Sequence, residues 1–595
     1  NEPPAIPEKT AQKRARPPRR AGFFGASISF LCLMGIAALF RLAYLDKRPM
    51  HADEAVQAFI FSDLLEHGKY RYDPAHYHGP LPHFINLPLM RALGIHKLDT
   101  LQPWQFRLQP ALAGLLLVLL CAAASGKVAS ETWQVESDEW LVAGRETTAL
   151  AGVFRPSALS LQPSFIVAAM LAVWSPLLAY FSRMAIHETL LACLALAVPL
   201  ASARFLATRR LRWLLAAGAA LGGLHATKET WGVIAFSWAA AALATGPAGA
   251  WRLLRETGAA RLALAAAVAL GVSFLFYSNF GRHPRGFADA WLSLFQYKTG
   301  AGHEAPWSYY LTDILAFRSA GGGYYGEGAI LIFAAIGAVF RMRNAECGMR
   351  NEEQDRPSVF SCGAAAPNSA FRTPHSAFVS PRSALPSFLA LSAVAQIVVY
   401  SIIGYKTPWL MLVPVACLVP LAGRGFVWMC GCLPRERRAA APGQSDEPAR
   451  PGKSPVATIW RQVIGSLAAF LILFLGVFPQ LHDVRHARAT DPALPLVYAP
   501  TLPEADAALR KAVASLKPGE LAAVIGDDYW PLPWYFRARR DDTGYYGESE
   551  APGDLGQFAL VVRCGFALPS GMRPGDKLVE LRPGYYARIS KQPAP

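Results

Sequence analysis

The chain has 595 residues, a mean hydropathy of +0.23 and only 17% charged residues. Charged residues make up about 25% of an ordinary soluble protein, so this composition excludes that class. The formal net charge is +16, but the Lys and Arg residues form short clusters between apolar runs. Because no contiguous basic domain exists, a nucleic-acid-binding role is also excluded.

Apolar runs without charged residues recur along the chain and predict about eleven membrane-spanning helices, since a helix of about 20 residues crosses ~30 Å of hydrocarbon. The longer runs are 21–40, 108–126, 156–182, 230–251, 262–281, 384–405 and 462–481. Shorter runs at 189–203, 213–227, 328–340 and 407–423 complete the set. The sequence therefore predicts an α-helical polytopic membrane protein.

Clusters of Lys and Arg set the expected orientation, because cytoplasmic loops are enriched in these residues. They lie before residue 21 and at 209–212, 252–261, 341–382 and 435–453. This pattern predicts a multi-pass protein of the inner (plasma) membrane with a cytoplasmic N-terminus. A transmembrane domain over 21–481 then has outer loops at 45–107 and 282–325. Cytoplasmic segments of biased composition are expected to be disordered; they are 1–20, 342–385 and 433–458.

Residues 482–595 are polar enough to form a small extracytoplasmic α/β domain. Their periodicity predicts a helix over 504–516 and strands at 521–525, 558–562 and 577–581. Two aromatic residues there, Trp530 and Trp534, could stack on a sugar, but ordinary aromatic packing is the preferred interpretation. The nine cysteines are scattered and predict neither a disulfide framework nor a zinc site.

The predicted topology brings several charged motifs that are distant in sequence to the outer face. They are Asp53-Glu54, Arg183, His187-Glu188, Lys228-Glu229, Lys406 and the 282–325 loop. The topology used only apolar runs and Lys/Arg clusters, so this convergence is an independent observation. It indicates a single functional site at the outer membrane interface.

The stretch 50–84 is the most polar of these motifs. Asp53 and Glu54 open a predicted helix that carries Val56, Phe59, Ile60 and Leu64 on one face and ends at Gly68. A general base held by a rigid helix is the favoured interpretation. The alternative is that both acids only complement the helix N-terminus, worth about 0.3–1 kcal/mol.

Cations and histidines at the same face have two possible roles each. Arg183, Lys228 and Lys406 either clamp a lipid phosphate or extend to the headgroup region as membrane-interface cations do. His51, His76, His78 and His83 either bind a divalent metal or make interfacial hydrogen bonds, and their spacing matches no metal motif, so the second is favoured. His187, Glu188 and Glu229 are further site candidates.

Five motifs together resemble the GT-C glycosyltransferases, and within them the dolichyl-phosphate-mannose protein mannosyltransferase superfamily. They are HADEAVQAF, YDPAHYHGPLPH, SRMAIHE, ATKETWG and YKTPWL. Within that superfamily, the motifs resemble the bacterial and archaeal subgroup labelled "flippase activity-associated". The resemblance covers about residues 20–480 and implies a GT-C-like transmembrane domain.

The resemblance implies inverting transfer of a sugar, as in the mannosyl- and other hexosyltransferases, from a polyprenyl-phosphate donor to an acceptor hydroxyl at the outer face. Asp53 matches the catalytic acid of the family, with Glu54 beside it. Arg183 and Lys228 are candidate phosphate contacts, and His78 falls where some relatives place a basic residue near the phosphate. The acceptor is a protein, lipid or glycan. The mannosyltransferase branch requires no metal and the chain has no clear D-x-D motif, so no cofactor is expected.

Two other functions remain open at this stage. The subgroup label suggests a transporter or flippase-associated protein, and a third possibility is a scaffold that binds polyprenyl lipid without transferase activity. A transporter places its ionisable groups near mid-membrane, commonly in repeated halves. Here the charges lie at span ends and no internal repeat is visible, which favours the enzyme.

Overall fold

The computed structural model describes residues 20–126, 163–296, 303–320, 323–339, 381–430, 467, 471, 488–566 and 572–591. The segments predicted to be disordered, 1–20, 342–385 and 433–458, fall wholly or largely outside these residues, as does the last apolar run, 462–481. At the edges of two segments the structure differs, because Arg20 and residues 381–385 belong to the helices Arg20–Leu42 and Pro381–Ile402. Elsewhere these four predictions are untested.

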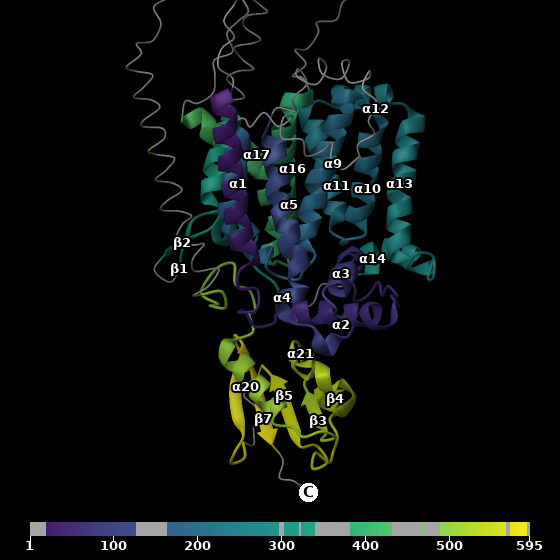
Figure 1. Ribbon diagram of the computed structural model, residues 1–595, viewed down its shortest axis with the longest axis vertical. Coiled ribbons are helices and arrows are strands. Elements are labelled where there is room, and N and C mark those ends of the chain that lie inside the picture. Colours follow the sequence, from purple (N-terminus) through teal and green to yellow (C-terminus); the bar gives the residue numbers. More distant parts are fainter. Residues whose placement is uncertain are drawn as a thin grey trace, which may run out of the picture.

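Each predicted apolar run within the described residues coincides with one or more helices, which stand side by side in Figure 1. They are α1 (Arg20–Leu42), α5 (Leu108–Ser125), α7 (Pro163–Trp174), α8 (Pro176–Phe181), α9 (Glu188–Thr208), α10 (Leu211–His225), α11 (Trp231–Thr245), α12 (Pro247–Thr257), α13 (Ala259–Tyr277), a helix over Gly328–Val339, α16 (Pro381–Ile402) and α17 (Leu412–Met429). The predicted helical membrane fold is confirmed.

Length and hydropathy together indicate which helices could cross a bilayer alone. Within the described residues, five helices are long and apolar enough to cross a bilayer alone, and a sixth if α11 and the end of α12, bent by 113°, form one broken span. The 156–182 run is interrupted at Ser175, where Pro176 begins α8 and the Ser175 hydroxyl caps it by accepting from the Leu178 amide. The chain is a multi-pass membrane protein, and the total of about eleven spans remains a prediction.

Small residues set the closest helix packing. Helix α10 lies against both α9 and α13. A Cβ atom added at Gly222 would lie 2.2 Å from the Ala269 carbonyl oxygen, and one at Gly218 would lie 2.4 Å from that of Ala265. Since any side chain there would separate the backbones, α10 and α13 pack through glycine, as membrane helices commonly do.

A polar layer lies below the apolar helices in Figure 1 and separates them from the C-terminal domain. It contains α2 (Ala52–His67), α3 (Leu81–Ala92), the short α4 (Pro103–Phe106) and α14 (Arg285–Gln296). Shorter elements near it are η1 (Leu98–Thr100), η3 (Tyr310–Leu315), η4 (Pro408–Met411) and the antiparallel pair β1 (Arg318–Ala320) and β2 (Gly323–Tyr325).

The predicted helix over part of the 50–84 stretch is α2, and it ends at Gly68, which adopts a left-handed conformation (φ 68°) as expected for a C-cap. Its buried face differs from the predicted one. Phe61 and Leu65 are fully buried, whereas Phe59 and Ile60 are only half-buried. The reason is a second partner: Phe59 meets Trp530 of the C-terminal domain edge-on, with ring centroids 5.5 Å apart.

The C-terminal domain is a five-stranded sheet in the order β4-β3-β5-β7-β6, with β3 parallel to β4 and β5 and the remaining pairs antiparallel. Its elements are α20 (Pro503–Ala514), β3 (Ala522–Ile525), α21 (Leu532–Phe536), η6 (Arg537–Asp542), β4 (Thr543–Tyr546), η7 (Glu548–Glu550), β5 (Leu560–Gly565), β6 (Lys577–Arg582) and β7 (Tyr585–Lys591). The predicted α/β architecture is confirmed, and β4 and β7 are additional strands.

The sheet domain is held firmly against the polar layer. Trp534 is fully buried in one apolar cluster with Phe61 and Phe106. Arg540 pairs with Glu66 of α2 at 2.6 Å. Trp534 therefore serves packing, as preferred above. These contacts cover part of the polar layer and leave the beginning of α2 facing the segment that enters the domain.

Candidate functional site

The charged motifs expected to converge lie at the ends of the helices that face the C-terminal domain (Figure 1). Direct contacts join three of them. The Ala185 amide donates to Glu54 at 2.8 Å, His187 binds the Gly79 carbonyl at 3.1 Å, and the Lys228 amine binds Glu188 at 2.5 Å. Parts of the chain that are remote in sequence thus form one polar region.

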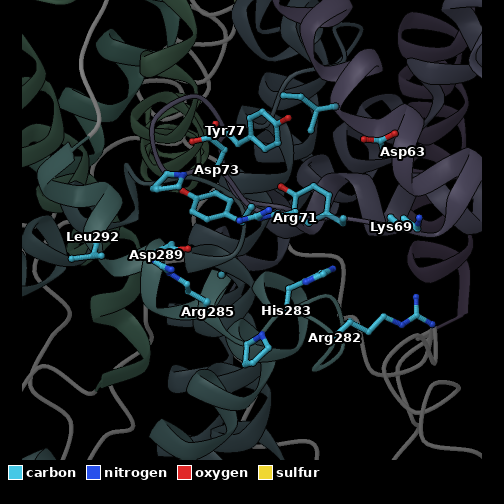
Figure 2. A pocket seen from close by; sticks show the side chains of 16 residues that line it. Asp63, Lys69, Arg71, Asp73, Tyr77, Arg282, His283, Arg285, Asp289 and Leu292 are labelled. Carbon is cyan, nitrogen blue, oxygen red and sulfur yellow. Dashed lines mark ion pairs between the residues drawn. The ribbon is translucent and has the colours of Figure 1, made fainter.

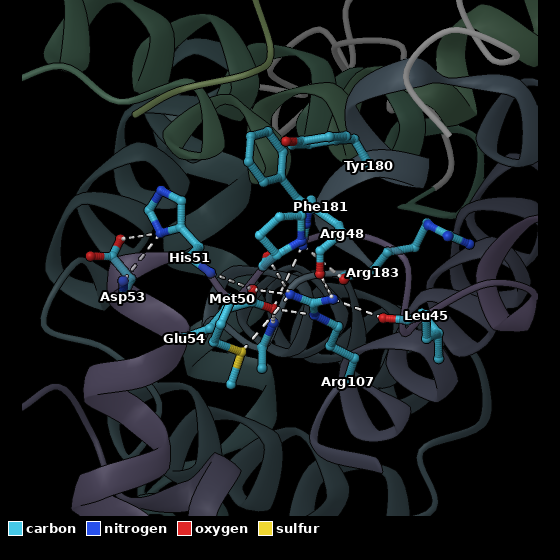
Figure 3. A network of polar contacts seen from close by, with 12 residues as sticks. Leu45, Arg48, Met50, His51, Asp53, Glu54, Arg107, Tyr180, Phe181 and Arg183 are labelled. Atoms are coloured by element: carbon cyan, nitrogen blue, oxygen red, sulfur yellow. Dashed lines mark hydrogen bonds and ion pairs between the residues drawn. The ribbon is translucent and has the colours of Figure 1, made fainter. Parts of the chain in front are cut away.

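Glu54 forms the centre of this region, as Figure 3 shows. Arg107 donates two hydrogen bonds to its carboxylate, Nε to Oε1 at 2.7 Å and Nη2 to Oε2 at 2.5 Å. The backbone amides of His51 and Ala185 donate to the same carboxylate, and Arg48 lies 3.6 Å from Oε1. Arg107 also donates to carbonyls of the loop between α1 and α2, those of Leu45, Arg48 and Pro49.

Every lone pair of a fully buried carboxylate needs a partner, and Glu54 has them. Burial alone would raise the pKa of Glu54, but the charges of Arg107 and Arg48, with hydrogen bonds from Arg107 and the Ala185 amide, outweigh it and lower the pKa to about 2. Glu54 is therefore ionised at neutral pH and closed to a substrate. It joins the start of α2 to the 183–187 segment and to α4.

Asp53, the acid next to Glu54 in sequence, points out of the buried network. Its side chain is 48% exposed and lies beside His51 at the edge of the network in Figure 3. His51 caps α2, because its Nδ1 accepts from the Asp53 amide at 3.1 Å. Its Nε2 lies 3.1 Å from the Tyr498 carbonyl, which can only accept, so the ring proton is on Nε2. Asp53 thus presents an accessible carboxylate from a helix start that is fixed on both sides.

Two residues near Asp53, His303 and Tyr498, were not predicted. The His303 ring lies between Tyr405 and Tyr498, at centroid distances of 4.9 and 5.5 Å, and its Nδ1 contacts the Tyr498 hydroxyl. Burial lowers the pKa of His303, and the nearby Asp53 carboxylate opposes this shift. Tyr498 lies in an uncharged stretch, and His303, although Glu304 follows it, was marked only by its place in the predicted outer loop.

A second cluster lies where the 72–80 segment meets the ends of α9 and α10. His78 donates from Nδ1 to Glu229 at 2.9 Å, and the rings of His78 and His187 meet edge-on at 5.1 Å. Burial alone would raise the pKa of Glu229, but the charges of His78 and Lys228 lower it to about 2. Burial and the neighbouring His78, His83 and Lys228 hold the pKa of His187 well below its usual value, so its ring is neutral.

The predicted phosphate-binding cations already have protein partners. Lys228 is buried with Glu188, and Arg183 donates to the carbonyls of Phe40, Ala43 and Tyr44 at the end of α1. The Lys406 amine donates to the Ile403 carbonyl, and its backbone amide donates to the His303 carbonyl at 2.9 Å. Lys406 therefore joins the Asp53 side of the region through His303.

The remaining histidines differ in environment. Burial lowers the pKa of His83 to about 3, and its ring stacks on Phe61 at 6.1 Å. His76 is exposed and pairs with Asp73 at 3.0 Å. Within the described residues, no three His, Cys, Asp or Glu side chains are grouped as metal ligands. The expected metal independence remains a prediction.

Comparison with known proteins places the fold. No protein-family model matches the chain, and no curated protein matches it. Among solved structures, ArnT from Cupriavidus metallidurans bound to undecaprenyl phosphate is similar at TM-score 0.50 and 16% identity, over 95% of this chain and 98% of that chain. The archaeal oligosaccharyltransferase AglB from Archaeoglobus fulgidus gives 0.48 and 11%, over 91% and 69%. The likeness to ArnT shows that the chain has the GT-C fold that the sequence motifs predicted.

Proposed function

We propose that this chain is a membrane glycosyltransferase that moves a sugar from a polyprenyl-phosphate carrier to an acceptor hydroxyl. The observation that carries the proposal is the pair Asp53 and Glu54. One carboxylate is half-exposed at a fixed helix start, and its neighbour is locked in a buried ion pair. The fold shared with ArnT, which was solved with undecaprenyl phosphate, supports a lipid-linked donor.

In this proposal Asp53 is the general base. Its carboxylate takes the proton of the acceptor hydroxyl while the hydroxyl oxygen bonds to the anomeric carbon of the sugar. The bond between that carbon and the phosphate oxygen breaks, and its electron pair leaves with the lipid phosphate. A single displacement of this kind inverts the anomeric configuration. No metal or cofactor takes part.

Cations near the leaving phosphate offset its charge. Lys228, Arg183, Lys406 and His78 remain the proposed contacts. Lys228 with Glu188, and His78 with Glu229, are pairs in which a phosphate oxygen can replace or join the carboxylate. Glu54 takes a positioning role, because its oxygens are already bound to Arg107 and to two backbone amides.

The test uses the full chain in nanodiscs with an undecaprenyl-phosphate-hexose donor and measures release of undecaprenyl phosphate. Asp53→Asn is expected to lower the rate by about 10²–10⁴-fold, the usual contribution of a general base. Asp46→Asn is the matched control, since Asp46 is 54% exposed in the loop before α2. Transfer by Asp53→Asn at the wild-type rate would disprove the base.

The same assay decides the alternative of a flippase-associated or lipid-binding protein. Wild-type protein that releases no phosphate from donors with several sugars, yet moves labelled polyprenyl phosphate across the bilayer, would establish that alternative. No contact within the described residues favours it over transfer.

A further inference from the structure

A cavity of about 810 Å³ lies apart from Asp53, between the 69–77 segment that follows α2 and the 282–289 turn into α14 (Figure 2). Of the residues of α2, only Ile60 and Asp63 line the cavity. Asp63 is ten residues beyond Asp53, about 15 Å along a helix. The volume is in the range of sites that hold small ligands, roughly 300–1,000 Å³.

The cavity wall combines donors, acceptors and aromatic rings. Its cations are Lys69, Arg71, Arg282 and Arg285, its acids are Asp63, Asp73 and Asp289, and its rings include Tyr70, Tyr72 and Tyr77. Sugar hydroxyls both donate and accept, so carboxylates and guanidinium groups together suit them. Four cations against three acids leave a positive excess, which favours an anionic group such as a phosphate.

The cations of the cavity are accessible, unlike those beside Glu54. Lys69 and Arg71 are exposed and have no side-chain hydrogen bond or ion pair with any described residue. Arg285 is 90% exposed and lies 3.8 Å from Asp289, while Arg282 donates to the Gly68 carbonyl at 3.0 Å. In Figure 2, Arg71 and Arg285 come from opposite walls.

The base of the cavity is fixed by close packing. A Cβ atom added at Gly286 would lie 2.3 Å from the Tyr277 carbonyl oxygen and 3.5 Å from the Tyr72 Cβ. Tyr72 and Tyr277 also meet edge-on at 4.7 Å. The 69–77 segment, the end of α13 and the start of α14 therefore hold each other in place, and the site is formed before a ligand binds.

One side of the cavity continues into an apolar surface. Leu292 of α14 lines the cavity and is exposed, and Trp291 and Phe295 beside it are exposed as well, Phe295 by 88%. An amphipathic helix with exposed aromatic and aliphatic residues at the end of the membrane helices is typical of the membrane interface. A ligand anchored in the membrane can reach the cavity over α14.

We propose that this cavity binds a lipid-anchored saccharide that carries a phosphate or carboxylate. The saccharide lies between Arg71 and Arg285, and the lipid chain leaves over Leu292. In the transferase proposed above, this ligand is an acceptor long enough for one of its hydroxyls to reach Asp53 from the cavity; that assignment rests on the proposed function, whereas binding in the cavity does not.

The test measures binding to the full chain in phosphatidylcholine nanodiscs. The probes are glucose 1-phosphate, neutral glucose and, in the membrane, phosphatidylinositol 4-phosphate. Glucose 1-phosphate is expected to bind at least tenfold more tightly than glucose, and Arg71→Gln with Arg285→Gln is expected to remove this difference. Arg91→Gln, an exposed arginine of α3 outside the cavity, is the matched control and keeps it.

Two results overturn the site: equal binding of glucose and glucose 1-phosphate, or wild-type binding by the double variant. Phosphatidylinositol 4-phosphate binding more tightly than glucose 1-phosphate supports the lipid anchor, and weaker or equal binding overturns that part.

Failure of the site and failure of the proposed function give different results. Asp53→Asn is expected to bind glucose 1-phosphate as the wild type does. If that variant still transfers sugar, the transferase mechanism fails while the binding site stands. If the double variant binds normally, the site fails while the transferase stands. In the acceptor role, the double variant raises KM for acceptor and leaves kcat within a few-fold.

Discussion

Glu54 and Asp53 are adjacent in sequence and have opposite environments, so their substitution should separate stability from activity. Replacing Glu54 by Gln leaves Arg107 as a buried charge without its counter-ion. Loss of one partner from a buried pair costs about 3–5 kcal/mol. Glu54→Gln is therefore expected to lower the midpoint of thermal unfolding in detergent, whereas Asp53→Asn and Asp46→Asn leave it unchanged. An unaltered midpoint in Glu54→Gln would show that the ion pair does not hold the region together.

The same carboxylate makes stability depend on pH. Its pKa in the folded chain, about 2, lies below the ordinary value of 4.5. Ionised Glu54 therefore contributes stability that is complete above pH 4.5 and is lost as the pH falls towards 2. Thermal unfolding of the wild type at pH 6 and pH 3 should show a drop in midpoint that is smaller in Glu54→Gln. Equal drops in both proteins would assign the effect to other groups.

The sequence identified those site residues that stand out from their immediate neighbours by charge. The acids, cations and histidines of the site were visible because charge is rare beside apolar runs. The partner of Glu54 was not, since Arg107 lies 53 positions away at the start of an apolar helix and looks like an ordinary interfacial cation. Tyr498 lies in an uncharged stretch and His303 has only Glu304 beside it. The fold, rather than a local pattern, brings both residues to Asp53.

At the scale of elements, the contact between α10 and α13 depends on Gly222. A side chain there meets the Ala269 carbonyl and Val272. Gly222→Val is expected to destabilise the chain by about 1–3 kcal/mol, the usual cost of overpacking. It should also weaken glucose 1-phosphate binding, because α13 leads into the cavity. Gly271→Val on α13, with no atom within 4 Å of an added Cβ, is the matched control. Equal thermal midpoints for the two variants would contradict close packing at Gly222.

Apolar length and periodicity predicted the helices, since hydrocarbon burial leaves few alternatives to a helix. The same reasoning misplaced the buried face of α2, because an interfacial helix between two partners has no single apolar side. It also missed β4 and β7. β4 has the sequence TGYY and no aliphatic side chain, and β7 is an inner strand whose burial follows from its neighbours β5 and β6.

For the whole molecule, the convergence of the charged motifs predicts that they are all accessible from the same side of the membrane as the C-terminal domain. Single cysteines at Asp46 and Lys577, in a cysteine-free background, should react with an impermeant maleimide added from the side of the C-terminal domain. A cysteine at Arg209, at the opposite end of α9, should react only from the other side. If the cysteines at positions 46 and 209 were labelled from the same side, the predicted topology would be wrong. The prediction of a single site at one face would then fail as well.

The contact between the start of α2 and the entry to the C-terminal domain has a consequence for biosynthesis. The Thr501 hydroxyl donates to the Met50 carbonyl at 2.7 Å across 451 positions. At about 5–20 residues per second, the ribosome makes the second partner roughly 20–90 s after the first. Throughout that interval Asp53 lies at the membrane without Tyr498 beside it. The nascent chain therefore brings Asp53 and Tyr498 together only after the C-terminal domain has been translated and has docked.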